Sequence, residues 1–539
     1  MKRLIYLIVL CSLSHAAWAV PARKGAILQT QPDGTPLITY QHGDEHFHWM
    51  TNEQGDWIKQ DENGVYQITT ALSAQEIANK RMAAPRRVTQ RETPLNIAKR
   101  GLIILVNFKD VAYTTSKAEM DSMLTGKNYT RDYSYKHFSQ TYTVQSEGSA
   151  WRYFYDSSYG QYDPQFDVVG PVTLSNKMSY YGSNNSMGSD KNPEQMVYDA
   201  CKMVDDSVDF SLYDNDNDGV MDFVYIIYAG YGEADGGSAN TIWPHQYYLS
   251  YYRYLKLDGI EIDRYACSNE LDFRTKAHAG IGTFCHEFSH VLGLPDLYET
   301  TNEKPHKTLG EWSILDYGPY SNEGNTPPAY SAYERFFMGW LTPTLIVDSA
   351  NITLKELQST NTALLISEND EHNLIGNDPD TTCFYILENR QQEGWDEYLP
   401  GHGLMLTKIR YSYKKWTDNT VNNAPKNMGV DLIEADSIAP EYPKNGYLGK
   451  PGDLFPKGAS EYLGIAEHPI EGIEEQNGVI TFKYRGGVTE TDVENVADTS
   501  PILAIYNVLG QKQTTLDITQ LPHGTYIVVR EKGSHTIVR

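Results

Sequence analysis

The stretch HEFSHVLGLPD, running from His286 to Asp296, carries the strongest indication of fold in this chain. On a helix, His286 and His290 lie one turn apart on the same face, which lets two imidazoles bind one metal ion. Glu287 then lies beside them, placed to take a proton from a metal-bound water and not to bind the metal. The spacing therefore predicts a hydrolytic zinc site with Glu287 as general base.

The residues after this helix predict a third ligand. Gly293 favours the left-handed backbone that ends a helix, and Pro295 prevents the helix from resuming. Asp296 then returns beneath the metal as the third ligand. Within zinc hydrolases, the alternative is a more distant carboxylate such as Glu299. A buried helix with chance polar residues is the other interpretation, but the full pattern arises by chance at a rate on the order of 10⁻³.

This pattern resembles a known family. HExxHxxGxx followed by a ligand resembles the metzincin clan of zinc peptidases, and an aspartate ligand followed by Leu-Tyr is similar to the immune inhibitor A-like metalloproteases. The resemblance covers roughly residues 20–487 and is strongest over residues 214–318. It implies a metzincin-like zinc protease domain of the α+β class.

The resemblance also implies a turn beneath the zinc, usually with a methionine. The matching segment is GEWSILDYG, residues 310–318, in which Leu315 stands where that methionine would be. Leucine is close to methionine in volume, so we expect this change to cost little. Tyr317 matches a position from which some clan members reach the metal or the developing oxyanion, and the resemblance implies that role here.

A second motif, DNDNDGVMD, begins at Asp214 and offers carboxylates around Gly219. Its glycine permits the sharp bend of a calcium-binding loop, and the predicted calcium ligands are Asp214, Asp216, Asp218 and Asp222. An EF-hand would need a bidentate Glu at the twelfth position, where this chain has Tyr225. We therefore expect the loop to lead into a buried strand and not a second helix. A solvated acidic turn is the alternative.

The start of the chain resembles an export signal. Lys2 and Arg3, an apolar stretch over residues 4–13 and Ala17-Trp18-Ala19 match the three regions of a secretory signal, so we predict a signal peptide over residues 1–19. No later segment approaches ~20 apolar residues, which predicts no transmembrane span. The protein should be secreted, or attached to the cell surface after periplasmic export.

The remaining chain divides by pattern. Residues 20–95 alternate short strands with turns and end in a basic, proline-broken stretch, which predicts a pro-segment. The catalytic domain, residues 96–341, opens on the apolar strand Leu102–Val106 and mixes strands with helices. Residues 342–487 lack a long amphipathic helix, which favours a β-rich, sandwich-like domain.

The end of the chain predicts a separate module. Residues 488–500 are an acidic linker, and residues 501–539 form a small β unit. This unit resembles the C-terminal sorting domains of bacterial type IX secretion, which implies the type IX machinery as a partner. An ordinary accessory β-module is the alternative.

The composition narrows the function further. The chain has 539 residues and a formal net charge of −25, which disfavours electrostatic binding to nucleic acid. Cys201, Cys267, Cys285 and Cys383 lie outside the signal, and four cysteines allow three pairings that the sequence does not distinguish. Cys285 lies on the flank of the helix opposite the metal, which favours a buried or disulfide-bonded side chain over a nucleophile.

The pro-segment predicts latency until it is cut in the basic stretch; the candidate cleavage sites are Arg86, Arg87, Arg91 and Arg100. No cysteine lies between Val20 and Cys201, so a direct block of the zinc would need a carboxylate or a histidine. Asp44, after Gly43 in HGDEH, is the best candidate. A polar turn between two strands is the alternative for this segment.

Together these features predict a secreted zinc endopeptidase, made as a precursor, that cuts protein or peptide substrates, with calcium as a structural cofactor. The hypothesis from another class is a calcium-stabilised surface adhesin whose zinc site is vestigial. The intact Glu287 argues against it.

Overall fold

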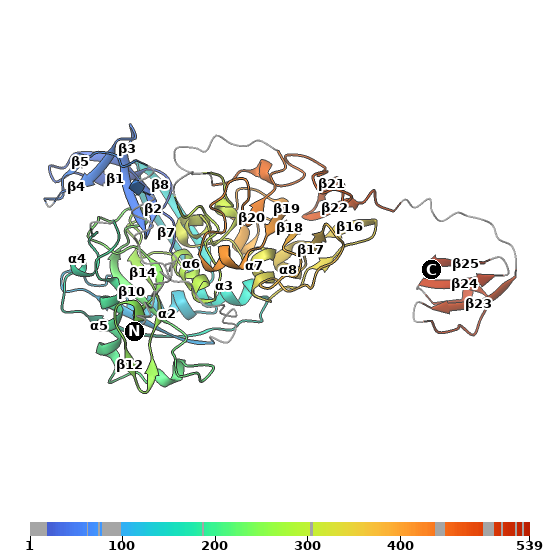
Figure 1. The fold of residues 1–539 in the computed structure, drawn as a ribbon, viewed down its shortest axis with the longest axis horizontal. Coiled ribbons are helices and arrows are strands. Elements are labelled where there is room, and N and C mark those ends of the chain that lie inside the picture. Colours follow the sequence, from blue (N-terminus) through green and yellow to red (C-terminus); the bar gives the residue numbers. More distant parts are fainter. Residues whose placement is uncertain are drawn as a thin grey trace, which may run out of the picture. The chain divides into compact units, whose positions relative to one another are not determined.

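The computed structural model describes residues 19–61, 63–73, 76–77, 99–185, 188–301, 306–436, 448–488, 501–507, 510–522, 525–530 and 533–538. The chain forms two compact units, Met1–Gly487 and Val488–Arg539, whose ribbons are drawn in Figure 1. Residues 1–18 of the predicted signal, the predicted cleavage sites Arg86, Arg87 and Arg91, and residues 489–500 of the predicted linker lie outside the described residues.

The first described sheet is an antiparallel meander in the predicted pro-segment. Its five strands pair in sequence order: β1 (Ile27–Thr30), β2 (Pro36–Asp44), β3 (Phe47–Asn52), β4 (Trp57–Gln60) and β5 (Tyr66–Ile68). Tight turns join them, as where the Gly34 N–H donates to the Gln31 carbonyl over 2.9 Å. The short strands expected between residues 20 and 95 are therefore present.

A mixed five-stranded sheet forms the centre of the larger unit, in the order β11-β14-β10-β6-β9. Four strands are parallel, and edge strand β11 runs antiparallel to β14. The strands are β6 (Arg100–Asn107), β9 (Gln165–Thr173), β10 (Val224–Tyr231), β11 (His245–Tyr248) and β14 (Arg264–Leu271). The acidic loop leads directly into β10, as expected.

Both faces of this sheet are covered. In β6 the predicted apolar run is fully buried, and alternate side chains such as Ile103 and Ile104 enter two different hydrophobic clusters. Helix α6 (Gly282–Val291) contributes Phe284 and Phe288 to the first cluster. Helix α5 (Pro193–Val204) contributes Met196 and Val197 to the second. A strand that is buried on both faces needs the continuous apolar sequence that residues 102–106 supply.

Other elements surround this centre in the same unit. The helices are α2 (Lys117–Thr125), α3 (Ala150–Ser157), α4 (Met178–Tyr181) and α7 (Ala332–Phe337). Two hairpins pair β7 (Thr130–His137) with β8 (Gln140–Glu147) and β12 (Lys256–Leu257) with β13 (Ile260–Glu261). The region is mixed α/β, with sheets and few helices, in agreement with the class expected for a metalloprotease domain.

Residues 342–487 contain two further sheets. The first has the order β15-β17-β18-β19-β20 and the second β16-β22-β21. Their strands are β15 (Thr344–Leu345), β16 (Ala350–Leu354), β17 (Leu364–Ser367), β18 (Cys383–Arg390), β19 (Gly403–Arg410), β20 (Val430–Leu432), β21 (Ile470–Gln476) and β22 (Val479–Tyr484). Two short helices, α8 (Leu357–Thr360) and α9 (Tyr413–Thr417), lie between them in sequence.

Strand β18 connects these sheets to the rest of the unit. Leu387 shares a hydrophobic cluster with Ile480 of the second sheet. Ile386, which points to the opposite face, shares a cluster with Phe288 of helix α6. The region after residue 341 therefore packs on the preceding part of the unit through a common core and is not a loosely attached module.

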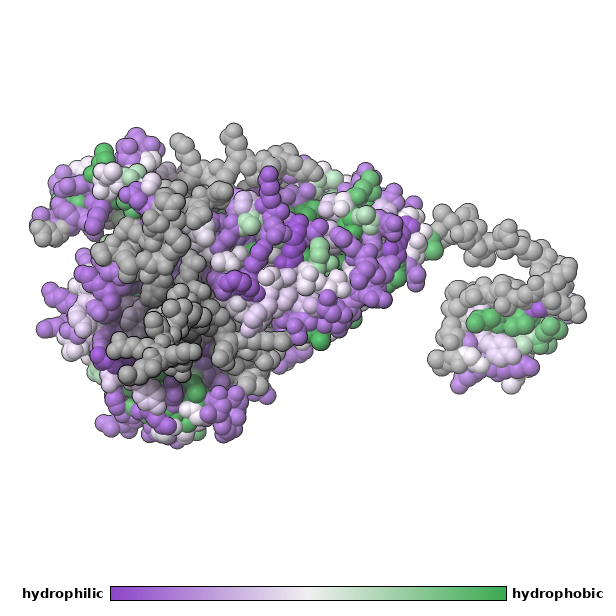
Figure 2. Space-filling model, viewed as in Figure 1, coloured by the Kyte–Doolittle hydropathy of each residue, from purple (hydrophilic) through white to green (hydrophobic). Residues whose placement is uncertain are grey.

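The second unit is a small antiparallel sheet of β23 (Ile502–Asn507), β24 (Thr525–Arg530) and β25 (Gly533–Val538). It has its own hydrophobic cluster, which includes Ile505, Leu521, Tyr526 and Val528. Leu503 and Ile527 are partly exposed, and Figure 2 shows apolar surface on this unit. Across the described residues, no helix is both long enough and apolar enough to cross a membrane.

Because each unit has its own hydrophobic cluster, a chain ending at Gly487 should keep the fold of the larger unit. We expect its thermal unfolding midpoint to lie within about 1 °C of the full-length value, which is roughly the shift that 1 kcal/mol produces in a unit of this size. Differential scanning calorimetry measures this. Unfolding at a markedly lower temperature would mean that the second unit supports the first.

Candidate metal centre and active site

Helix α6 brings the two predicted histidine ligands together. His286 and His290 are buried, and their Nε2 atoms lie 3.0 Å apart. The apolar side of the same helix fixes its position, since the Phe288 ring packs edge to face on Phe223 and Phe154. The pKa of His286 is lowered mainly by burial and, to a smaller extent, by the charge of the neighbouring His290. The lowered pKa favours the neutral imidazole, which is the form that binds a metal.

The chain reverses after the helix as the sequence predicts. Gly293 has φ of 101°, a left-handed conformation that costs glycine little. Asp296 is consequently fully buried, with its Oδ1 atom 3.2 Å from the Nε2 atoms of both His286 and His290. Among the described residues no hydrogen bond satisfies Asp296 Oδ1. One carboxylate and two imidazole atoms that converge in this way fit three protein ligands of a catalytic zinc ion.

Contacts behind the ligands orient them. His286 Nδ1 lies 2.7 Å from the Ile314 carbonyl oxygen, and His290 Nδ1 lies 2.8 Å from that of Leu294. These carbonyls accept from Nδ1–H and direct each Nε2 atom toward the other ligand atoms. Asn419, which follows helix α9, donates from Nδ2 to Asp296 Oδ2 over 2.6 Å and accepts the Asp296 N–H at its Oδ1 over 2.8 Å.

Sequence reasoning did not identify Asn419. It lies 123 positions from Asp296, in the β-rich region. No local motif marks it, because its role depends on a contact made only when the two regions pack together.

Glu287 is the residue placed beside the ligands. Its side chain is fully buried and does not belong to the three-residue metal cluster. Its Oε1 atom accepts the N–H of Val20 over 2.7 Å, and burial raises its pKa well above the usual range. A buried carboxylate that touches an amide N–H beside a metal cluster has the position required of a general base and acid.

The predicted turn beneath the metal lies where expected. Leu315 is fully buried, and its carbonyl accepts the N–H of Leu297, the residue after the third ligand. Leu315, which the resemblance places at the methionine of this turn, is thus a packing residue. Tyr317 is mostly buried, and Lys24 Nζ lies 4.8 Å from the centre of its ring.

A different tyrosine contacts a backbone carbonyl near the centre. The Tyr298 hydroxyl donates to the carbonyl of Ala19 over 2.6 Å. Its sequence signal was available, because Tyr298 is the tyrosine of the Asp-Leu-Tyr motif that follows the third ligand.

The two other predicted carboxylates have local partners. Asp44 is buried at the end of β2, and its Oδ1 atom accepts the N–H groups of His46 and Phe47 over 3.0 and 3.3 Å. Glu299, the alternative third ligand, accepts the N–H of Thr301 over 2.8 Å. Of the described residues, the metal cluster around His286 includes neither.

The acidic loop brings together three of its four predicted ligands. Asp214, Asp216 and Asp218 offer carboxylate oxygens within 4.8 Å of one another. The Asp214 side chain also accepts the N–H groups of Asp218 and Gly219, both over 3.0 Å. Asp222 is not part of this cluster, and its Oδ2 atom accepts the Asn215 N–H over 3.2 Å.

The cysteines form no disulfide among the described residues. Cys285 is fully buried on the apolar flank of helix α6, and burial raises its pKa well above the usual range. A buried thiol with a raised pKa is a poor nucleophile, in agreement with the expected packing role.

Comparison with known proteins gives the family context. Residues 94–341 match the family model of the immune inhibitor A peptidase M6 catalytic domain. The chain is 25% identical over 272 residues to immune inhibitor A of Bacillus thuringiensis subsp. alesti, covering 44% of this chain and 39% of that protein. It is 27% identical over 269 residues to the pre-pro-metalloprotease PrtV of Vibrio cholerae serotype O1, covering 44% of this chain and 29% of the relative.

The chain therefore spans less than two thirds of the length of either relative. The matched segment contains helix α6, the turn to Asp296 and Tyr317. Residues 94–341 are thus similar to peptidase M6 catalytic domains of the immune inhibitor A type, and this match together with the two relatives supports a metalloendopeptidase domain.

Proposed function

We propose that this protein is a zinc-dependent endopeptidase, secreted as a precursor, that hydrolyses protein or peptide substrates. The observation that carries the proposal is the convergence of His286, His290 and Asp296 within 3.2 Å, with Glu287 beside them in a buried site. The peptidase M6 match of residues 94–341 supports the same reaction.

The proposed mechanism divides the work between the metal and the chain. A zinc ion held by His286, His290 and Asp296 would supply Lewis acidity toward water and the scissile carbonyl. Glu287 takes the proton of the attacking water and returns it to the amine that leaves. Its contact with the Val20 N–H supports this role, since an amide nitrogen of a peptide already lies within hydrogen-bonding distance. Tyr317 is a further proposed residue for stabilising the oxyanion.

The adhesin alternative is not favoured. It would treat the zinc site as vestigial, whereas Glu287 and the three ligands are intact and the family match supports a metalloendopeptidase. A casein or gelatin zymogram with and without a chelator separates the two functions: the endopeptidase gives a clearing that the chelator abolishes, and the adhesin gives none.

Residues 20–95 are proposed to act as a pro-segment. The V. cholerae relative is itself named a pre-pro-metalloprotease, which agrees with a precursor. That Asp44 blocks the zinc directly remains a prediction. An uncleaved Asp44→Ala precursor that is more active than the wild-type precursor would support this prediction. Of the predicted cleavage sites, Arg100 is described; it forms an ion pair with Asp167 over 2.6 Å.

The C-terminal unit is proposed to direct export through the type IX machinery. Its compact sheet and its place after an acidic linker support a detachable module. The chain that ends at Gly487 tests this in a host with that machinery: it should stay in the periplasm while the full-length protein leaves. Normal release of the shortened protein would contradict the sorting role.

Glu287→Gln should keep about one zinc per chain but lower kcat/KM by about 10²–10⁴-fold, because the ligands survive and only the proton-transfer group is lost. Metal analysis and hydrolysis of a quenched fluorescent peptide measure the two quantities. Retained activity with lost metal would contradict the assignment of roles.

Asp296→Ala should weaken zinc binding, whereas Glu299→Ala should leave it close to wild type, because only Asp296 lies against both imidazoles. Competition with a zinc-chelating dye measures both affinities. The reverse result would make Glu299 the third ligand.

Asn419→Ala should lower zinc affinity about 10–100-fold, because the Asp296 carboxylate loses the partner that holds it in place. Asn423→Ala is the matched control, since Asn423 bonds to Thr300 and not to a ligand. Equal zinc affinities for the two variants would mean that the contact with Asn419 does not orient Asp296.

The acidic loop is proposed to bind a structural calcium ion, supported by the three converging carboxylates. Replacing Asp216 and Asp218 together by Asn should lower the unfolding midpoint in millimolar calcium by about 1 °C for each kcal/mol of binding energy lost, because the unfolding entropy of so large a unit is about 1 kcal/mol/K. Without calcium the difference should vanish. The exposed Asp206→Asn variant is the control, and equal shifts in both conditions would leave the loop an ordinary turn.

A further inference from the structure

The residues from Ala19 to Arg23, here called the inserted segment, lie against the candidate active site. Ala19, Val20 and Ala22 are fully buried and share a hydrophobic cluster with Ala234 and Trp243 of the catalytic domain. A chain segment of small apolar residues is thus buried against the residues that would have to bind a substrate.

One peptide group of the inserted segment has both of its polar atoms held by the site. The Ala19 carbonyl accepts from the Tyr298 hydroxyl over 2.6 Å, and the Val20 N–H donates to Glu287 over 2.7 Å. A peptidase must polarise the carbonyl of the bond it cuts and deliver a proton to the nitrogen of that bond. The Ala19–Val20 bond has this arrangement.

The next residues are held through their main chain. The Trp243 indole N–H donates to the Val20 carbonyl over 3.0 Å, and the Tyr320 hydroxyl donates to the Pro21 carbonyl over 2.7 Å. The Arg23 N–H then donates to the Ala234 carbonyl over 2.8 Å. Recognition of an extended peptide by its backbone suits a protein that binds many sequences, and leaves selectivity to side-chain pockets.

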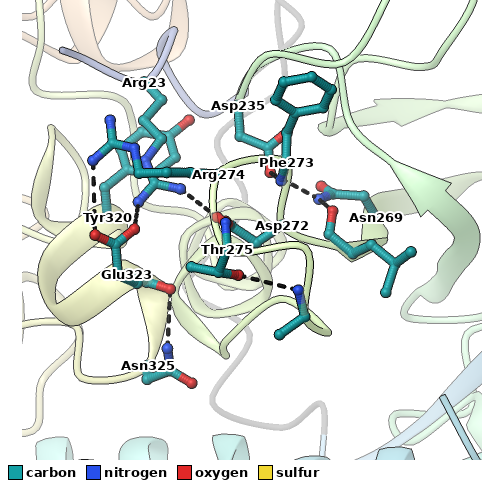
Figure 3. A network of polar contacts seen from close by, with 12 residues as sticks. Arg23, Asp235, Asn269, Asp272, Phe273, Arg274, Thr275, Tyr320, Glu323 and Asn325 are labelled. Carbon is teal, nitrogen blue, oxygen red and sulfur yellow. Dashed lines mark hydrogen bonds and ion pairs between the residues drawn. The ribbon is translucent and has the colours of Figure 1, made fainter. Parts of the chain in front are cut away.

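Arg23 enters such a pocket. Its guanidinium, on a side chain only 3% exposed, forms ion pairs with Asp272 and Glu323 and lies 5.5 Å from the centre of the Tyr320 ring. Figure 3 shows these groups facing one another, with Asp235 beside them. Asp235 is 6% exposed, and its Oδ1 atom has no hydrogen-bond partner among the described residues.

The catalytic region holds the three acids in place without help from Arg23. The Thr275 N–H donates to Asp272 over 2.7 Å, the Tyr135 hydroxyl donates to Glu323 over 2.6 Å, and the Phe273 N–H donates to Asp235 over 3.2 Å. Arg274 lies 3.7 Å from Glu323, and Lys276 is a further cation beside Asp235 and Asp272. If Arg23 leaves, Asp272 and Glu323 each lose an ion-pair partner in a buried site, so the pocket favours a new cation.

Resting on the proposed peptidase function, we infer that the inserted segment lies as a substrate does, with the Ala19–Val20 bond in the position of the bond to be cut. We infer further that the pocket of Asp235, Asp272 and Glu323 selects a basic side chain, preferably arginine, at the fourth residue after that bond. Arginine suits it because the planar guanidinium pairs with two carboxylates at once.

The predicted export signal ends at this same bond. Removal of the signal after Ala19 leaves Val20 to Arg23 in place. These residues then occupy the part of the site that binds the product with the new amino terminus. The segment then blocks the precursor as a retained product would, and the Arg23 pocket anchors it.

Binding of a labelled peptide tests the pocket without requiring hydrolysis. The host is the full-length chain with Glu287→Gln, to stop cleavage, and Arg23→Glu, to expel the inserted segment by charge repulsion. The probes are fluorescent ten-residue peptides with the sequence of residues 16–25 and Arg, Lys, Ala or Glu at the position of Arg23. We expect the Arg peptide to bind at least about tenfold more tightly than the Ala peptide by fluorescence anisotropy, with Glu weakest.

Charge-only changes in the pocket provide the controls. Adding Glu323→Gln or Asp272→Asn to the host should remove most of the preference for Arg, whereas Glu397→Gln, at an exposed acid, should not. Two pocket variants are used so that misfolding of one does not decide the result. The unfolding midpoint of each variant is compared with that of the host. Equal binding of the Arg and Ala peptides to the host would overturn the inference.

Activity of the uncleaved precursor gives a separate readout. Full-length Arg23→Ala should hydrolyse a quenched peptide at least about tenfold faster than wild type, because the inserted segment loses its anchor. Lys59→Ala removes an exposed charge from the same pro-segment and should behave as wild type. If no variant hydrolyses any peptide although zinc is bound, the proposed function fails, while the anisotropy result still decides the pocket.

Discussion

The position of the Asp296 carboxylate is the constraint on which the candidate active site depends. One of its oxygens lies between two buried imidazoles, and the other accepts a hydrogen bond from Asn419. A buried carboxylate oxygen without a hydrogen bond is unfavourable unless a cation is bound, so this geometry favours a metal ion. The backbone reversal at Gly293 brings Asp296 to that point, and Asn419 holds it there.

This contact makes the β-rich region part of the candidate active site. Asn419 lies outside residues 94–341, the segment that matches the peptidase M6 catalytic domain. Strand β18 packs on helix α6 through a shared core on one face and on the second β-sheet on its other face. The orientation of this predicted metal ligand therefore depends on packing across the domain boundary that the sequence pattern predicts at residue 341. A catalytic region without its β-rich neighbour would lack that support.

The inserted segment relates latency to specificity. Val20 contacts Glu287, the proposed general base, while Arg23 lies in a buried acidic pocket at the fourth residue after the Ala19–Val20 bond. The Trp243 indole and the Tyr320 hydroxyl donate to the main-chain carbonyls of Val20 and Pro21. A segment held this way must be displaced before another peptide binds. The groups that held the segment can then bind the incoming peptide. Inhibition and substrate choice would thus use one set of contacts.

The sequence by itself determined the local chemistry. The spacing from His286 to Asp296 predicted the helix, its end at Gly293 and the return of Asp296 toward the two histidines, since helical periodicity and glycine conformation are properties of neighbouring residues. The apolar run at Leu102–Val106 likewise predicted a strand buried on both faces. Only the tertiary structure decided that Asn419 holds Asp296, that Val20 contacts Glu287 and that Asp272 and Glu323 receive Arg23. These pairs are 123 to 300 residues apart, and contacts over such distances depend on how sheets and helices pack, which no local pattern of residues encodes.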